Sequence, residues 1–292
     1  MTAPKNSMRD RYKQTRARVR TSRHGRWAPT PIEPQIVARV AARALSEASV
    51  VIESAPNSAV EQLPSVAVVI CVWDRIDRTT NLLRALAESK GVRADVYLWN
   101  NRVDAAARLT EHLLSCPDTL PRVSLATSQL NIGGFGRFYW ARSLANNYRS
   151  VVFIDDDQLV DGFSLKTLVD EWTPETIRSV WAYKFGNRFD YWYRTQVEPG
   201  DRAMYVGTGG MVADATIFRD DGLFDCPPRY WFMEDLWLSH YAETVCGWRL
   251  FRSAAEIGVL LDGKDQYHSL VHAKSEFYRE LNKDGRWFGM SR

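Results

Sequence analysis

Residues 151–157 read VVFIDDD, four apolar residues followed at once by three aspartates. A short, mostly β-branched run of this kind is typical of a buried strand in a parallel sheet. Three adjacent carboxylates repel one another and resist burial, so they need solvent, a cation or cationic side chains. Ligands of open α/β sheets bind beyond the carboxyl ends of the strands. We therefore expect a ligand site where this strand ends.

Asp155 and Asp157 are separated by one residue. In an extended chain they can point the same way while Asp156 points aside. Two such carboxylates suit a hard divalent cation, Mg²⁺ or Mn²⁺, that also holds phosphate oxygens. The alternative is an acidic turn that caps the next helix.

Strands alternate with helices in the first half of the chain. The sequence predicts strands over 66–73, 95–99, 123–126 and 151–154, separated by helices over 78–89, 104–114 and 135–147. This rhythm indicates right-handed βαβ units, and so an α/β fold with a Rossmann-like, mostly parallel sheet flanked by helices. The second half is less regular and rich in aromatic residues, which predicts a smaller mixed half.

We expect four segments: a basic arm over 1–34, a helix and linker over 35–63, and two halves over 64–160 and 161–292. The net charge of +3 is uneven, because residues 1–31 carry nine Lys or Arg and one acid. Such an arm suits anionic lipid, nucleic acid or acidic glycan, or it remains a solvated tail. The body of the chain is mildly acidic.

The composition indicates a soluble or membrane-peripheral protein. The longest notable apolar run, Val66–Trp73, is far shorter than the roughly 20 residues that span a bilayer. The N-terminus lacks the apolar core of a secretory signal. Four cysteines without a CxxC pair indicate buried free thiols in a reducing compartment rather than a zinc site. We expect a cytoplasmic location, with the inner face of the membrane as the alternative.

Three further patterns are candidates for chemistry. The glycines of NIGGFG (131–136) allow close backbone approach and positive φ before a helix, although an ordinary turn is the alternative. Arg75 follows a strand end and suits a diphosphate or a nucleobase pocket, or else lies on the surface. Glu234 and Asp235 open a helix, where a carboxylate is either a cap or a general base.

Five stretches resemble the family 2 glycosyltransferases, inverting enzymes of the GT-A fold that use nucleoside-diphosphate sugars. They are VICVWDR (69–75), WNN (99–101), NIGGFG (131–136), the aspartate triplet and MEDLWLSHYA (233–242). The NIGGFG element is similar to that of the galactofuranosyl- and rhamnosyltransferase-like branch. The resemblance covers about residues 65–272.

The resemblance implies roles for particular residues. Asp155 and Asp157 stand for the DxD motif that holds Mn²⁺ or Mg²⁺, and His268 or His272, spaced four apart, completes the metal site. Asp235 stands for the catalytic base, with Glu234 positioning the base or the acceptor. The donor-binding residues implied are Arg75, Asn100, Asn101, Asn131, Gly133, Gly134, Asp155 and Asp156.

Two departures from the family pattern leave the nucleotide open: Asp74 replaces the usual Asn, and Trp99-Asn100-Asn101 lacks the common Asp. The expected donor is a UDP-sugar, with a TDP-sugar as the alternative. A hexosyl or deoxyhexosyl group would go to a glycan, lipid-linked glycan or other macromolecule. The competing interpretations are transfer to a nucleic acid or a virion protein, a sugar nucleotidyltransferase, and a non-catalytic nucleic-acid-binding protein that uses the arm.

Overall fold

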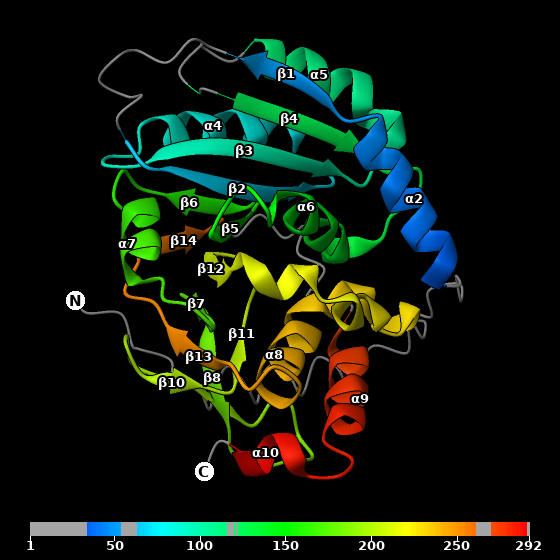
Figure 1. Cartoon of the computed structure of the whole chain (residues 1–292), viewed down its shortest axis with the longest axis vertical. Helices are drawn as coiled ribbons and strands as arrows, with labels where there is room; N and C mark the ends of the chain where they lie inside the picture. The colour runs from blue at the N-terminus through cyan, green and yellow to red at the C-terminus, as the bar shows by residue number, and fades with distance from the viewer. Residues whose placement is uncertain (1–33, 54–62, 116–119, 121, 261–269, 291–292) are drawn as a thin grey trace, which may run out of the picture.

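The computed structural model describes residues 34–53, 63–115, 120, 122–260 and 270–290. A nine-stranded sheet runs through these residues in the order β1-β4-β3-β2-β5-β12-β7-β13-β10. Figure 1 shows helices packed around this sheet. Within the described part of the chain, no helix is both long and apolar enough to cross a bilayer.

The first half follows the predicted alternation. Its elements are α2 (Pro34–Ser46), β1 (Ser49–Glu53), β2 (Ser65–Val72), α4 (Ile76–Ala87), β3 (Arg93–Asn100), η1 (Val103–Ala105), α5 (Ala106–Leu114), β4 (Arg122–Thr127), η2 (Gly133–Phe135), α6 (Gly136–Leu144) and β5 (Ser150–Asp155). Every predicted strand and helix between residues 66 and 154 is therefore present. The expected boundaries differ from the observed ones by a few residues.

The strands β4, β3, β2 and β5 are neighbours in that order and run parallel. Their register pairs Cys71 with Asp155 and Val72 with Asn100. The carboxyl ends of β2, β3 and β5 therefore meet at one edge of the sheet, where ligands bind in such folds. The predicted α/β class, a parallel nucleus with a mixed second half, is confirmed.

One strand was not foreseen. The segment over 35–63 was expected to be a helix and linker, but Ser49–Glu53 forms β1 and pairs antiparallel with β4. Its sequence SVVIE contains three β-branched residues, which suit a half-buried edge strand. The strand is short, and its pairing covers the otherwise open edge of β4.

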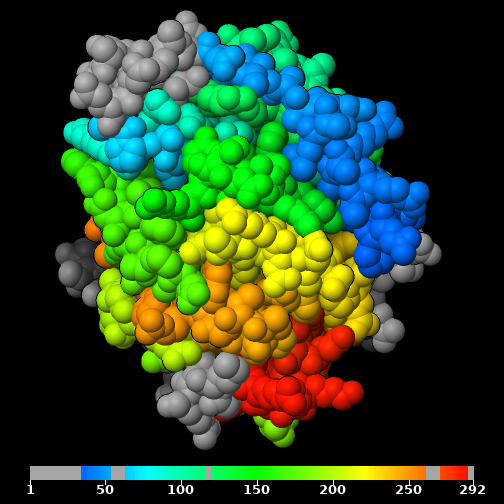
Figure 2. Space-filling model, in the orientation of Figure 1, coloured from blue at the N-terminus to red at the C-terminus, as the bar shows by residue number. Residues whose placement is uncertain are grey.

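The second half is mixed, as expected. Its elements are β6 (Gln158–Val160), α7 (Ser164–Glu171), β7 (Thr176–Ser179), β8 (Ala182–Phe185), β9 (Arg194–Gln196), β10 (Arg202–Ala203), β11 (Tyr205–Val206), β12 (Met211–Asp214), η3 (Ala215–Arg219), η4 (Asp221–Asp225), η5 (Pro228–Met233), α8 (Glu234–Thr244), β13 (Arg249–Arg252), β14 (Ile257–Val259), α9 (Val271–Leu281) and α10 (Arg286–Met290). Two smaller sheets, β11-β8-β9 and β14-β6, flank the main one. In Figure 2 the yellow segments of the second half directly abut the green segments of the first.

The pleat of β5 decides which face each aspartate meets. Val151 and Phe153 belong to the core cluster that contains α6, whereas Val152 and Ile154 belong to the cluster that contains α4 and α7. Because side chains alternate along a strand, Asp155 emerges on the α6 face. The start of β12, which runs antiparallel to β5, lies beside the same strand end.

Candidate active site

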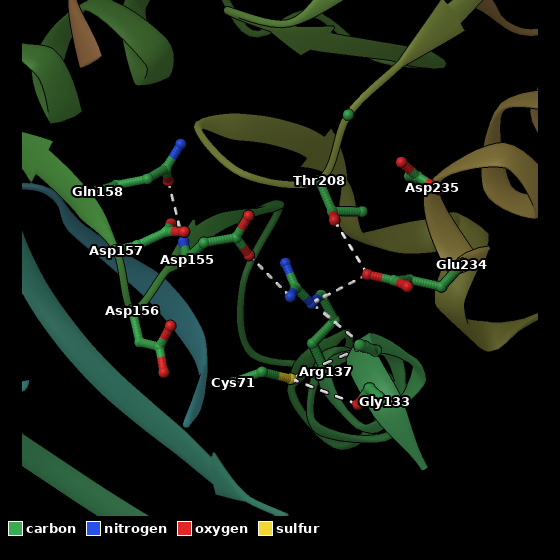
Figure 3. Close-up of polar contacts among 12 residues, drawn as sticks. Cys71, Gly133, Arg137, Asp155, Asp156, Asp157, Gln158, Thr208, Glu234 and Asp235 are labelled. Atoms are coloured by element: carbon green, nitrogen blue, oxygen red, sulfur yellow. Dashed lines mark hydrogen bonds and ion pairs between the residues drawn. The ribbon is translucent and has the colours of Figure 1, made fainter. Parts of the chain in front are cut away.

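The acidic triplet is held by two arginines. Oδ1 of Asp155 lies 2.8 Å from Nη2 of Arg137. Oδ1 of Asp156 accepts a hydrogen bond from Nη1 of Arg75 at 3.0 Å, and Oδ2 of Asp157 lies 3.7 Å from Nη2 of the same residue. Figure 3 shows Asp155 and Asp157 side by side, with Asp156 turned away, as strand alternation predicts. Asp155 and Asp157 are thus placed to share a ligand.

The two arginines do not neutralise the site. Burial raises the pKa of Asp157 to about 6, and the nearby charge of Asp155 adds to this rise. Burial also raises the pKa of Asp156, although Arg75 opposes the shift. With Glu234, four carboxylates face two guanidinium groups. A further cation would therefore stabilise the ionised triplet.

The glycine loop brings backbone against the site. Gly133 has φ of +62°, in the left-handed region that favours glycine. A Cβ on Gly134 would lie 1.9 Å from Oε1 of Glu234, and a Cβ on Gly136 would lie 2.1 Å from Nε1 of Trp99. No side chain fits at such distances. Gly134 and Gly136 are therefore needed for the loop to pack closely against Glu234 and Trp99, and not only to form the turn.

The side chain of Asn101 holds the glycine loop in place by hydrogen bonds. Its buried Oδ1 accepts hydrogen bonds from Nε1 of Trp99 at 3.1 Å and from the backbone N of Ile132 at 3.2 Å. Its Nδ2 donates to the carbonyl of Gly133 at 3.0 Å. An aspartate at this position could not donate this last bond, because a carboxylate has no N–H. The asparagine that follows β3 therefore fits these contacts.

The other two expected asparagines differ in position. Asn131 lines the cavity, and its Oδ1 accepts from the backbone N of Gly133 at 2.9 Å. Asn100 instead folds onto Arg102, accepting from its N at 2.9 Å and donating to its O at 2.8 Å. Asn100 does not line the cavity, so these contacts give it a structural role.

Glu234 is the buried carboxylate of the pair at the start of α8. Its Oε1 accepts from Oγ1 of Thr208 at 3.1 Å and lies 3.6 Å from Nε of Arg137. Burial raises its pKa to about 7, while Arg137 opposes the rise and Asp235 adds to it. Figure 3 shows its side chain directed toward Arg137, whose guanidinium lies between Glu234 and Asp155.

Asp235 makes different contacts. Its Oδ2 accepts a hydrogen bond from the hydroxyl of Tyr205 and lies 3.7 Å from Nζ of Lys274. The hydroxyl of Tyr191 donates in turn to Tyr205 at 3.2 Å. Burial, together with the charge of Asp235, raises the pKa of Tyr205 and keeps it protonated. Glu234 and Asp235 therefore lie in two distinct environments although they are adjacent in sequence.

Arg137 connects these groups and was not among the residues predicted from the sequence. The residue is 5% exposed, and its Nε donates to the carbonyl of Gly134 at 3.1 Å. Burial opposes its charge, but the carboxylates of Asp155 and Glu234 raise its pKa. The sequence contained one signal for it: a lone cation in the otherwise uncharged run FGRFYW (135–140), directly after the glycines.

One cavity of about 440 Å³ lies among these groups; Glu234 borders it, whereas Asp235 and Asn100 do not. Its walls are formed by Cys71, Trp73, Asp74, Arg75, Asn101, Asn131, Gly133, Gly134, Arg137, Asp155, Asp156, Asp157, Gln158, Trp181, Phe232, Glu234, Val259, Leu270 and Lys274. Most of the predicted donor-binding residues are thus gathered in one place. Besides Arg137, sequence reasoning missed Gln158, whose Oε1 accepts from the backbone N of Asp155 at 2.9 Å.

Among the described residues, no cysteine belongs to a group of side chains that could hold a metal ion. Cys71, Cys226 and Cys246 are free thiols, and Cys116 lies outside the described residues. Cys71 lies in the cavity wall, and burial raises the pKa of its thiol to about 11. A thiol with so high a pKa remains protonated at neutral pH and is a poor nucleophile.

The histidines do not complete a metal site within the described chain. His268 lies in the segment over 261–269, outside the described residues. His272 is exposed in the first turn of α9 and is absent from the cavity wall. Across the described ranges, no three His, Cys, Asp or Glu side chains are grouped to hold a metal ion. A histidine ligand remains a prediction for His268.

The residues present fit a divalent cation only if part of its ligand set comes from a bound phosphate. The excess of carboxylate over arginine favours a cation at Asp155 and Asp157. However, one oxygen of Asp155 is engaged by Arg137, and two carboxylates form a small ligand set. Proteins commonly hold Mg²⁺ through one or two carboxylates together with the phosphates of a substrate. The site therefore suits a cation that arrives together with a phosphate-bearing ligand.

A second, more open hollow of about 590 Å³ lies beside the first. Its wall includes Arg252, Glu256 and Gln196, and it shares Trp181 with the cavity at the triplet. None of the three aspartates borders it. It adjoins the candidate site but contains none of the candidate catalytic groups.

Comparison with known proteins gives matches among solved structures. No protein-family model matches the chain. No curated protein matches it either. The mannosyltransferase PcManGT from Pyrobaculum calidifontis, in complex with GDP-Man and Mn²⁺, is similar at a TM-score of 0.49 with 14% identity, over 86% of this chain and 71% of that one. S. aureus TarS 1–349 in complex with UDP-GlcNAc is similar at a TM-score of 0.42 with 13% identity, over 65% of this chain and 55% of that one. The chain thus spans about half the length of TarS 1–349.

Proposed function

We propose that this protein is a metal-dependent inverting glycosyltransferase of the GT-A type. It transfers a hexosyl or deoxyhexosyl group from a nucleoside-diphosphate sugar to a hydroxyl of a glycan, lipid-linked glycan or other macromolecule. One observation carries the proposal. The glycine loop, the acidic triplet and the start of α8, separated in sequence, meet at one cavity at the carboxyl ends of parallel strands.

The donor lies between the glycine loop and the triplet in this proposal. The loop offers close backbone approach at Gly133 and Gly134, and Arg75 supplies a cation 12% exposed at the cavity wall. A diphosphate carries negative charge that these groups offset. The mixed polar and aromatic wall, including Trp73 and Asn131, accepts the nucleoside. A UDP-sugar is the favoured donor.

Asp235 is the general base in the proposed reaction. An in-line displacement requires the base on the face of the anomeric carbon opposite the leaving diphosphate. Glu234 shares Arg137 with Asp155, and we assign both carboxylates to the side of the leaving group. Asp235 instead meets Tyr205 and Lys274, and of these Lys274 borders the cavity whereas Asp235 does not; we assign the acceptor hydroxyl to the side of Asp235 and Lys274. One displacement inverts the anomeric centre without a covalent enzyme intermediate.

Asp155 and Asp157 would hold the divalent cation, Mn²⁺ or Mg²⁺. When bound, it supplies positive charge that stabilises the departing diphosphate. Arg75 and Arg137 complete the cationic side of the pocket. Glu234 positions Arg137, and the hydroxyl of Thr208 holds Glu234 in turn.

A screen of UDP-, TDP- and GDP-sugars tests the function. The expected result is hydrolysis of at least one of them that depends on Mn²⁺ or Mg²⁺, with release of the nucleoside diphosphate and thermal protection by that donor. Release of pyrophosphate instead would identify a sugar nucleotidyltransferase. Failure to bind or turn over any of these compounds would overturn the proposal.

A further inference from the structure

Arg137 has a donor group that its protein contacts do not use. Its Nη2 lies against Asp155, its Nε lies against Gly134 and Glu234, and the guanidinium also interacts with the thiol of Cys71. Among the described residues, Nη1 has no hydrogen-bond partner, although it is buried. The side chain is 6% exposed and forms part of the cavity wall.

A buried guanidinium N–H without a partner is costly, because the group has lost its water. Such an atom is explained by strain accepted for structural reasons, by a ligand that arrives later, or by an ordered water. The position of Arg137 favours the second. Figure 3 shows its guanidinium between Asp155 and Glu234, at the centre of the groups that border the cavity.

The same guanidinium also occupies the carboxylate that a divalent cation needs. Its Nη2 lies 2.8 Å from Oδ1 of Asp155, while Asp157 has only the longer 3.7 Å contact with Arg75. A metal ion and a guanidinium repel one another at such range. A cation therefore binds Asp155 well only after Arg137 has gained a second anion.

We infer that Arg137 is the resident counter-ion of the acidic triplet and a diphosphate-binding residue, so that it makes metal binding dependent on the donor. Without donor, Arg137 neutralises Asp155 and weakens divalent-cation binding. With donor, Nη1 donates to a phosphate oxygen, and Asp155 and Asp157 would hold the cation. This inference rests on the proposed function and adds to it the order in which the ligands bind.

The test measures two affinities in the whole protein. Binding of Mn²⁺ alone is followed by loss of its free electron paramagnetic resonance signal. Binding of UDP, TDP and GDP is followed by calorimetry at a Mn²⁺ concentration that saturates both proteins. The variant Arg137→Gln removes the charge and keeps an amide donor. Arg142→Gln is the matched control, because Arg142 lies on the same helix and pairs with exposed Asp221 outside the cavity.

Arg137→Gln should raise the affinity for Mn²⁺ alone about tenfold, because Asp155 loses its competing cation. It should lower the affinity for the nucleoside diphosphate about tenfold or more at saturating Mn²⁺, because a charge-assisted hydrogen bond is lost. Arg137→Lys keeps the charge and should restore the weak binding of Mn²⁺ alone. The control should change neither affinity.

The opposite signs separate this role from a structural one, since partial unfolding would lower both affinities. Equal Mn²⁺ affinity in Arg137→Gln and wild type would overturn the counter-ion role. Unchanged nucleotide affinity would overturn the diphosphate contact while leaving the proposed function standing. A wild-type protein that binds none of the three nucleotides would overturn both.

Discussion

Asp157→Asn should stabilise the metal-free protein at neutral pH. Folding raises the pKa of Asp157 from 3.8 to about 6, through burial and the nearby charge of Asp155. At about 1.4 kcal/mol per pKa unit, ionised Asp157 opposes folding by at most about 3 kcal/mol. The carboxyl is 19% exposed and partly screened, so we expect the variant to gain about 2 kcal/mol in the free energy of unfolding.

The gain in the free energy of unfolding of Asp157→Asn should increase as the pH rises. Because the folded pKa lies above the unfolded one, the native wild-type protein binds the extra proton between about pH 4 and 6. Wild-type stability contributed by this group is therefore present below pH 4 and lost as the pH rises through 6. The advantage of Asp157→Asn should be absent near pH 4 and complete at pH 7.

Urea unfolding in EDTA at both pH values measures this difference. Asp170→Asn is the control, because Asp170 is an exposed partner of Lys166 and should change stability by less than about 1 kcal/mol. Excess Mn²⁺ and nucleotide should reverse the order, since they stabilise the wild type and not the variant. A variant less stable than wild type at pH 7, or a difference independent of pH, would refute the reasoning.

Three further predictions concern catalysis and the N-terminal arm. Asp235→Asn should lower kcat by about 10² or more with donor affinity unchanged, and Glu234→Gln should be milder; steady-state kinetics would assign the base to Glu234 if the ranking were reversed. Gly134→Ala should weaken donor binding, because its Cβ would displace the Glu234 carboxylate, and calorimetry on protein of unchanged circular dichroism checks this. Deletion of residues 1–31 should leave hydrolysis of free donor unchanged and weaken action on a large anionic acceptor. That loss should shrink as salt rises, and equal transfer rates by full-length and truncated protein would make the arm a passive tail.

The sequence by itself determined the parallel half of the fold and singled out two segments that line the cavity. The alternation of apolar strands and amphipathic helices between residues 66 and 154 is a local pattern, and it gave the correct order of elements. The aspartate triplet after a buried strand and the glycines before a helix are also local signals. Both lie at the cavity, because the carboxyl ends of neighbouring parallel strands meet at one edge.

Only the tertiary structure decided how the charges of that site are paired. Arg137 meets Asp155 because the pleat of β5 turns Asp155 toward α6, and it meets Glu234 because α8 begins beside the glycine loop. Asn101 and Asn100 are adjacent in sequence, yet one holds the loop and the other folds onto its own turn. These are contacts between segments distant in sequence or choices of side-chain direction. Sequence periodicity and composition predict neither the contacts between distant segments nor the direction of a side chain. Both patterns depend only on residues that are close together along the chain.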